Sequence, residues 1–473
     1  MRRGDTLAAM DDLNARMRAL PAVSALLDHE DCAKLAEGRS RDRVVVALRA
    51  ALDAARRDVT RGAAAPDAAA IVGAAAALLA SADRPGLRRV VNATGIVLHT
   101  GLGRAVLPKA AIDALVAEAA GYCLLAIDAE TNERGRRERF SEEILKELTG
   151  CEAATVVNNN AAACMLVLNT LAAGREVIVS RGQLVEIGGA FRMPDVMARS
   201  GCRMVEVGCT NRTHLSDYRN AITPATAAII RVHPSNYRVV GFVGEPSIEE
   251  LVALGRAHGI PVIDDLGSGA LVKLDAAFDE PLVADSLRAG ADVVTCSADK
   301  LIGGPQGGVI LGKSAIVGRC DDNQLARALR AGKLDLIALE ATLRLFRDKA
   351  VLLRDHPTAR MLTESVDTIA ARAKKLVAAL KKAVPSLAAS VEDGVSYAGS
   401  GALPVREIPT KCVVLDPPEG VSAADAARRL RTGDPSLFVR VKSDRLFLDP
   451  RTIQPGEEAL VVEALRGLTA TQS

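Results

Sequence analysis

The chain has 473 residues, of which 49% are apolar and 25% charged, and its formal net charge at pH 7 is +2. This length exceeds what one hydrophobic core normally organises, so we expect two or three domains. The near-neutral charge excludes a nucleic-acid binder that acts through a global positive field, so any RNA contact must be local.

Cysteines, histidines and apolar runs narrow the class of protein further. Nine cysteines without paired C-x-x-C spacing and six histidines without a zinc-binding pattern argue against structural zinc, and free thiols suit a reducing cytosol. The first five residues lack the apolar segment of a signal peptide. The longest apolar run, 68–80, is too short to span a bilayer. We expect a cytoplasmic protein with no metal site and no contact with membranes.

Residues 1–65 are predicted to form a helical N-terminal domain. Apolar residues such as Val44, Leu48, Leu52 and Val59 recur there at helical spacing. Basic residues outnumber acidic ones between positions 39 and 61, which fits either a solvated helix face or a surface that contacts RNA phosphates. A linker helix is expected over 66–86, because it is rich in alanine and ends in a turn-forming sequence.

Residues 87–345 alternate short apolar runs with helical patterns. The strand candidates are 154–157, 177–180, 204–207, 227–233, 261–266, 292–297 and 308–311. This alternation predicts an α/β domain with a mostly parallel seven-stranded sheet covered on both faces, whose ligands bind beyond the carboxyl ends of the strands. Residues 346–473 read as a smaller α/β domain with a long helix over 363–383 and strands near 411–415, 437–441 and 446–448.

Lys300 is the most informative residue of the predicted sheet. It follows the strand 292–297 and precedes a glycine-rich turn over 303–308. A lysine at the end of a buried strand is costly to desolvate, unless it is engaged as a Schiff base with a carbonyl cofactor. The glycines would let the backbone approach a planar cofactor closely. Taken alone, the segment is more typical of a solvated loop lysine.

Two further strand ends support a pyridoxal phosphate (PLP) site. Asp265 ends the preceding strand, where its carboxylate could accept a hydrogen bond from the protonated ring nitrogen of PLP. Asn158, Asn159 and Asn160 follow the strand 154–157 and open a helix, whose amide groups could hold a phosphate. A turn or a helix cap would explain each motif singly. Together with Lys300 they favour PLP.

Arginines gather in polar loops punctuated by glycine, at Arg104, at Arg134, Arg136 and Arg137, and at Arg327 and Arg330. Arginine is suited to bidentate capture of phosphate-like anions, although a single one is more often paired at the surface. The three clusters suggest a second anion site, distinct from that of the cofactor phosphate.

These motifs together resemble the bacterial L-seryl-tRNA(Sec) selenium transferase (selenocysteine synthase) family. The resemblance covers almost the whole chain, through the segments 20–23, 92–104, 130–137, 157–163, 180–194, 206–215, 235–237, 265–269, 297–306, 340–343 and 446–455. It implies a fold-type I PLP-dependent transferase, similar to aspartate aminotransferase, with an N-terminal domain that binds tRNA(Sec) and a homodecameric assembly.

The resemblance also implies a role for each site residue. Lys300 would carry the Schiff base and remove the seryl Cα proton, and Asp265 would pair with the pyridine nitrogen. The selenophosphate pocket would be lined by Arg104, Arg134, Arg327 and Arg330, supported by Asp299. Cofactor contacts are expected from Asn159, Asn160, Ala161, Asn236, Ser268 and Ser297. The implied reaction is β-elimination of seryl-tRNA(Sec) to an aminoacrylyl-tRNA, followed by addition of selenium from selenophosphate.

Five positions depart from the family pattern, namely Gly101, Asn132, Gln183, Cys209 and Ala298. Two other functions stay open. One is a PLP-dependent lyase that acts on a small amino acid or amino-sugar acid, against which the N-terminal domain argues. The other is a non-catalytic RNA-binding or assembly protein, against which the intact Lys300 and Asp265 argue.

Overall fold

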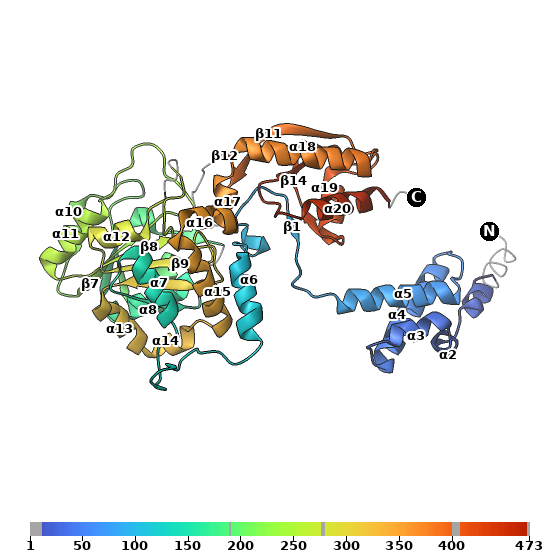
Figure 1. Cartoon of the computed structure of the whole chain (residues 1–473), viewed down its shortest axis with the longest axis horizontal. Coiled ribbons are helices and arrows are strands. Elements are labelled where there is room, and N and C mark those ends of the chain that lie inside the picture. The colour runs from blue at the N-terminus through green and yellow to red at the C-terminus, as the bar shows by residue number, and fades with distance from the viewer. Residues whose placement is uncertain (1–11, 189–190, 276–279, 400–406, 471–473) are drawn as a thin grey trace, which may run out of the picture. The chain divides into compact units, whose positions relative to one another are not determined.

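The computed structural model describes residues 12–188, 191–275, 280–399 and 407–470 (Figure 1). Residues 1–11 of the predicted N-terminal domain, and 400–406 and 471–473 of the predicted C-terminal domain, lie outside these ranges. The chain divides into two compact units, Met1–Arg89 and Val90–Ser473. Among the described residues, no helix is both long enough and apolar enough to cross a membrane.

The first unit contains the helices α2 (Val23–Leu27), α3 (Glu30–Ala36), α4 (Arg41–Thr60) and α5 (Ala68–Asp83). Leu48 and Leu52 on the predicted apolar stripe of α4 are buried in one core with Ile71 of α5. Arg39, just before α4, and Arg43, in its first turn, both donate to the carboxylate of Asp83 at the end of α5. The alanine-rich helix is therefore part of the core of this unit.

A seven-stranded sheet organises the second unit. Its strands, in spatial order, are β2 (Ala153–Val157), β10 (Gly308–Gly312), β9 (Val293–Ser297), β8 (Val262–Gly267), β7 (Thr226–Val232), β3 (Glu176–Ser180) and β6 (Arg203–Val207). β10 runs antiparallel to both of its neighbours, and the other neighbouring pairs are parallel. All seven predicted strands are present, and the prediction of a mostly parallel sheet is confirmed.

Helices cover both faces of this sheet (Figure 1). One apolar core joins the sheet to α7 (Arg139–Thr149), α10 (Leu215–Ala221), α11 (Ile248–His258), α12 (Val283–Ala289) and α15 (Lys333–Arg344). A second core joins it to α8 (Asn160–Ala172), α9 (Met193–Arg199) and α13 (Ser314–Asp322). The remaining elements before the small domain are α6 (Lys109–Ala119), α14 (Gln324–Leu329), α16 (Lys349–Asp355), α17 (Pro357–Thr363) and the short strands β4 (Glu186–Ile187) and β5 (Phe191–Arg192).

The C-terminal part of this unit is a smaller α/β domain. Its sheet has the order β11 (Ala389–Tyr397), β12 (Glu407–Leu415), β15 (Arg445–Leu448) and β14 (Arg440–Lys442). The helices α18 (Val366–Ala383), α19 (Ala423–Thr432) and α20 (Glu458–Ala470) complete it. The strand β1 (Val91–Asn92) pairs in parallel with β13 (Leu437–Phe438), so the start of the unit is anchored in this domain.

Two predictions for the C-terminal region are wrong in detail. The helix predicted over 363–383 is present as α18, but it begins later, at Val366, behind Ser365, whose side chain accepts a hydrogen bond from the Thr368 amide. The strand predicted over 437–441 is two elements, β13 and β14, which pair in different sheets. Serine is a favoured N-cap because its hydroxyl accepts a hydrogen bond from a backbone amide of the first turn, which explains why the helix begins after Ser365.

The nine cysteines are all free. Seven of them are buried, at positions 32, 151, 164, 202, 296, 320 and 412, whereas Cys209 is exposed and Cys123 is half-buried. Burial raises the pKa of each of the seven buried thiols, to about 12 in Cys296.

Candidate active site

Lys300 lies in the turn that joins β9 to the antiparallel β10, at the carboxyl end of the parallel strands. Hydrogen bonds from the Ala298 amide to the Gly307 carbonyl and from the Gly304 amide to the Ala298 carbonyl, each 2.9 Å long, close this turn. The lysine is only 5% exposed. Burial lowers the pKa of Lys300, and the nearby Asp265 opposes that shift. Burial therefore favours the neutral amine, which is the form that acts as a nucleophile or a base.

Asp265 is buried in β8 and is held by its neighbours on two elements. Its Oδ1 accepts hydrogen bonds from Asn160 Nδ2 at 2.8 Å and from Thr295 Oγ1 at 3.0 Å. Burial raises the pKa of Asp265, and these hydrogen bonds oppose the shift because they favour the carboxylate. Oδ2 takes part in neither bond. This oxygen is the one that suits a protonated ring nitrogen.

The backbone beside Lys300 forms a cradle without side chains. Gly267 has φ +64°, and a Cβ on it would lie 3.6 Å from Ser235 Oγ and 3.8 Å from Lys300 Nζ. The hydroxyl and the amine therefore face the same space. The next residue, Ser268, is fully buried, and its Oγ has no hydrogen-bond partner within the described part of the chain. An unpaired buried hydroxyl is costly, so this observation indicates a bound group.

The start of α8 provides a second side of the site. Asn159 caps the helix, because its Oδ1 accepts a hydrogen bond from the Ala162 amide at 2.9 Å. Asn160 and Ala161 form the first turn, where free amide groups favour an anion such as a phosphate. A Cβ on Gly308 would approach the Asn159 carbonyl oxygen to 2.1 Å, so only glycine fits there. Ser297, the backbone partner of Gly308, is buried at the end of β9.

These features match the parts of PLP one by one. A buried lysine suits its aldehyde, a carboxylate oxygen suits its ring nitrogen, and a capped helix start suits its phosphate. The residues of this chain therefore fit the cofactor.

The predicted arginines divide into two groups. Arg104 Nη1 donates to Asp299 Oδ2 at 2.6 Å, which places both beside Lys300. Arg330 follows α14, which contains Arg327, and its backbone forms a bridge with Val157 next to the start of α8. Both Arg327 and Arg330 are exposed.

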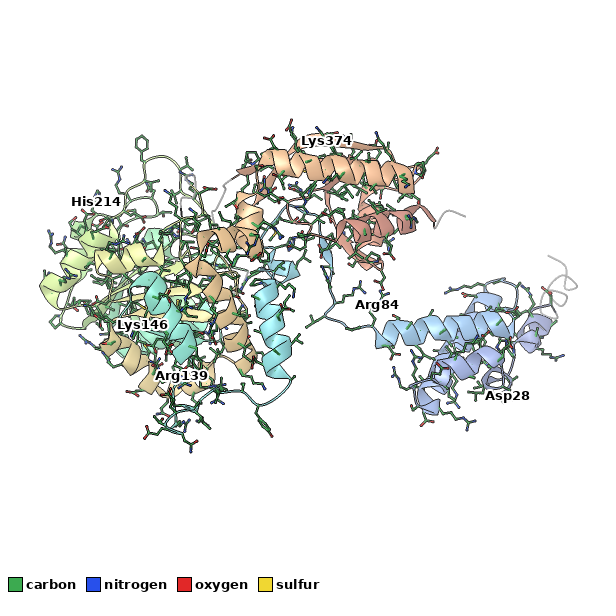
Figure 2. All side chains as sticks on the ribbon, viewed as in Figure 1. Asp28, Arg84, Arg139, Lys146, His214 and Lys374 are labelled. Atoms are coloured by element: carbon green, nitrogen blue, oxygen red, sulfur yellow. The ribbon has the colours of Figure 1, made fainter. Side chains whose placement is uncertain are left out.

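Arg134 is placed differently, on an exposed loop. Arg139 of α7, labelled in Figure 2, ties this loop to the helix through an ion pair of 2.7 Å with Asp128. No hydrogen bond or ion pair among the described residues joins Arg134 to Lys300 or Arg104.

The structure differs from the predicted set of cofactor contacts at two residues. The Asn236 amide donates to the Glu186 carbonyl at 2.8 Å and is exposed, whereas its neighbour Ser235 faces Lys300. Thr295 was not predicted, although it lies opposite Asp265 in the β8–β9 register. Sequence alone could not have assigned Thr295, because the register of neighbouring strands is a tertiary property.

Three of the unusual positions have a local explanation. Asn132 has φ +57°, a left-handed conformation that glycine and asparagine tolerate best. Ala298 is accommodated because Gly307 lies opposite, where a second Cβ would come within 3.2 Å of the alanine methyl group. Gln183 accepts from the Val232 amide and donates to Glu245 Oε2, both at 3.1 Å. A glutamate at 183 would replace that donor with a second carboxylate. Nothing in the structure explains Gly101 or Cys209.

A buried histidine supports the turn from outside. His356 Nε2 lies 2.8 Å from the Ile302 carbonyl, and Nδ1 accepts from the Ala359 amide at 3.1 Å. The second bond fixes the proton on Nε2, which donates to Ile302. The ring also lies against Gly303, where a Cβ would be 2.2 Å from His356 Cε1. Burial lowers the pKa of His356. This residue positions the segment directly after Lys300.

Comparison with known proteins identifies the family. Residues 90–454 match the family model of L-seryl-tRNA selenium transferase, and residues 17–56 match that of the selenocysteine synthase N terminal region. The chain belongs to the L-seryl-tRNA selenium transferase family. The family relatives include the L-seryl-tRNA(Sec) selenium transferases of Geotalea uraniireducens, 46% identical over 96% of this chain and 99% of the relative, and of Solidesulfovibrio magneticus, 48% identical over 95% and 97%.

Solved structures agree on the fold. D-Glucosaminate-6-phosphate ammonia-lyase matches with a TM-score of 0.57 and 21% identity, over 82% of this chain and 97% of that one. At this identity the match shows the fold alone. This member of the L-seryl-tRNA selenium transferase family is thus a PLP-dependent enzyme of fold type I, as predicted.

Proposed function

We propose that this enzyme converts seryl-tRNA(Sec) to selenocysteinyl-tRNA(Sec), with selenophosphate as the selenium donor. The observation that carries the proposal is the meeting of Lys300, Asp265 and the start of α8 at one buried site, in a chain of this family. The reaction exchanges the serine hydroxyl for a selenol and releases phosphate.

Lys300 is the residue that binds the cofactor and moves the proton. When bound, PLP supplies an electron sink for negative charge at the seryl Cα. Lys300 would hold PLP through its Nζ, and this amine would be free once the seryl amine is bound in its place. The Lys300 Nζ then removes the Cα proton, and burial, which lowers the pKa of Lys300, favours the basic form of the amine. The serine hydroxyl leaves from Cβ, and selenium adds to the same carbon.

Asp265 keeps the ring nitrogen protonated. Its carboxylate is buried at the end of the sheet where Lys300 lies, and Asn160 and Thr295 favour the charged form by donating to it. Ser235 and Ser268 are the hydroxyl groups available to polar atoms of the cofactor.

The arginines are proposed to hold selenophosphate. Arg104, oriented by Asp299, is next to Lys300, and the Arg330 backbone bridges to Val157 next to the start of α8, directly after α14 with Arg327. Arg134 lies on an exposed loop, and no hydrogen bond or ion pair among the described residues joins it to Arg104 or Lys300, so we propose that it reaches the pocket of a second copy of the chain. That arrangement implies a homo-oligomer, and the resemblance specifies a decamer. We also propose a cytoplasmic location, where the thiols remain reduced.

The test is incubation of the PLP-loaded protein with seryl-tRNA(Sec) and selenophosphate, followed by assay of selenocysteinyl-tRNA. Arg104→Gln should lower the rate by raising the KM for selenophosphate, while Arg203→Gln, at the opposite end of the sheet, should not. Absence of product from wild-type protein that retains its cofactor would refute the proposal.

A further inference from the structure

A cavity of about 450 Å³ adjoins the lysine site at the end of β7. His233 belongs to the wall between them, because it lines the cavity while its amide donates to the Asp265 carbonyl at 2.9 Å. Tyr237, two residues after Ser235, also lines the cavity. The other side is the segment 209–213, which ends next to His214, labelled in Figure 2. The cavity and the lysine site therefore share a wall.

The lining combines an aromatic ring with cations. Tyr237 is half-buried, and its phenol donates to the Gly182 carbonyl, which fixes the ring. Burial and Glu245 raise the pKa of Tyr237, so the phenol remains protonated. Arg212 and Arg238 are exposed at the cavity, and neither forms an ion pair within the described ranges. The chain has only four tyrosines, so an abundance of tyrosine does not explain why one of them lines this largely polar cavity.

The proposed substrate requires a nucleoside at this position, and the inference rests on that proposed function. In an aminoacyl-tRNA the amino acid is esterified to the ribose of the terminal nucleotide. When the seryl Cα is at Lys300, the ribose and base must occupy the adjoining space. Nucleobases stack on aromatic side chains, and the phosphate of a nucleotide pairs well with arginine.

We propose that this cavity binds the 3′-terminal adenosine nucleotide of the aminoacyl-tRNA. The base stacks on Tyr237, and Arg212 and Arg238 contact the phosphate at the rim. Glu245 is placed to accept a hydrogen bond from a ribose hydroxyl or the adenine amino group, because only its Oε2 is taken by Gln183. The volume lies in the range of about 300–1,000 Å³ typical of small-molecule sites.

The experiment compares two esters that share the serine but differ in the alcohol. The PLP-loaded full-length protein is titrated with 3′-O-L-seryladenosine and with L-serine methyl ester, and the change of the cofactor absorption gives both dissociation constants. We expect the adenosine ester to bind at least about tenfold more tightly, as stacking of one base predicts. Tyr237→Leu should remove most of this ratio. Tyr237→Phe, which keeps the ring, and the distant Arg203→Gln should preserve it.

Equal affinities of the two esters in the wild type, or an unchanged ratio in Tyr237→Leu, would overturn the inference. If neither ester alters the absorption of bound cofactor, the proposed function itself is contradicted. Calorimetric titration with AMP then tests separately whether the cavity binds a nucleotide. AMP binding that is weakened in Tyr237→Leu and in Arg212→Gln supports a nucleotide site. Unchanged AMP binding in both variants, or binding of inorganic phosphate that equals that of AMP, refutes it.

Discussion

Lys300 combines two demands that conflict in an ordinary lysine. It must be buried to shield the reaction from water, and it must remain uncharged to act as a base. Burial in the β9–β10 turn meets both demands, because desolvation lowers the pKa of Lys300. The nearby Asp265 and Asp299 limit this shift.

Lys300→Ala is expected to abolish the visible absorption of lysine-bound cofactor. Activity should fall by about 10²–10⁴-fold or more, because the covalent link and the proton-transfer base are both lost. Spectra and product assays of the purified protein measure this. Lys313→Ala, which removes an exposed lysine paired with Asp292, is the matched control and should keep both properties. A Lys300→Ala protein with wild-type absorption would contradict the assignment.

Asp265→Asn should separate binding of the cofactor from catalysis. The amide retains the size of the carboxylate but cannot stabilise a proton on the ring nitrogen. Lys300 should still bind PLP, while kcat falls by about 10²-fold or more. Thr295→Val, which removes only one of the two donors to Asp265, should have a smaller effect. Equal kcat values for Asp265→Asn and the wild type would exclude the proposed pairing.

The site residues that could be predicted from the sequence are those that lie near the ends of predicted strands. Lys300 and Asn159 follow strands and Asp265 lies near the carboxyl end of β8, and the topology of a parallel sheet brings such residues to one edge. Thr295 was missed as a site residue because its role depends on strand register. The resemblance included Ser235 with Asn236 in the segment 235–237, but it predicted Asn236 as the cofactor contact, whereas the Ser235 hydroxyl faces Lys300.

At the scale of elements, the turn after β9 is fixed on two sides. Its strands are held in the sheet by antiparallel pairing, and α17 presses the His356 ring against Gly303. α17 is in turn joined to the small domain, because the buried Arg451 donates to the carbonyl groups of Met361 and Glu364. The loop that carries the catalytic lysine is thus coupled to a domain that contributes no residue to the described cofactor site.

His356→Leu tests this support. It leaves the Ile302 carbonyl and the Ala359 amide unpaired, which should cost about 1–3 kcal/mol of stability for each group. The buried histidine has a lowered pKa, so the unfolded chain binds more protons than the folded one near and below its usual value of about 6.5. Stability from the neutral ring is therefore present above that pH and is lost as the pH falls.

The variant lacks this proton uptake, so its stability deficit should narrow between pH 8 and pH 5. Thermal unfolding of both apo-proteins across that range is the measurement. His356→Gln, which can still donate to Ile302, should lose less stability at pH 8. If the difference in melting temperature between the wild type and His356→Leu stayed the same from pH 8 to pH 5, His356 would not take up a proton on unfolding.

The sequence predicted elements well where periodicity was clear and poorly where short segments change partners. Each of the seven strands of the large sheet contains a short apolar run, as in β2, β7 and β9, which accounts for their correct prediction. β11 was missed because charged and polar residues such as Glu392 and Asp393 occupy it, and its pairing with β12 supplies the stability that its composition lacks.

At the scale of the whole molecule, the division into two units allows substrate binding and chemistry to be separated. The first unit has its own core, built from α2 to α5, and the cofactor site lies entirely in the second. We predicted the tRNA-binding domain over 1–65, yet α5 shares its core. Deletion should therefore remove residues 1–89.

This deletion is expected to leave the visible absorption of bound PLP intact and to weaken tRNA(Sec) binding by at least about 10²-fold, because the phosphate contacts proposed for this unit are lost. Filter binding at two salt concentrations measures the affinity and its salt dependence. A truncated protein that binds tRNA(Sec) with the affinity of the full chain would assign recognition to the second unit.

The buried thiols have a consequence for selenium chemistry. Thiolates, rather than thiols, attack electrophiles and are oxidised. Seven of the nine cysteines are buried and have raised pKa values, so the protein presents few thiolates that could add to the substrate Cβ in place of the proposed selenium nucleophile. Cys209 is the exposed exception. A thiol-specific dye should therefore label Cys209 before any of the seven buried cysteines.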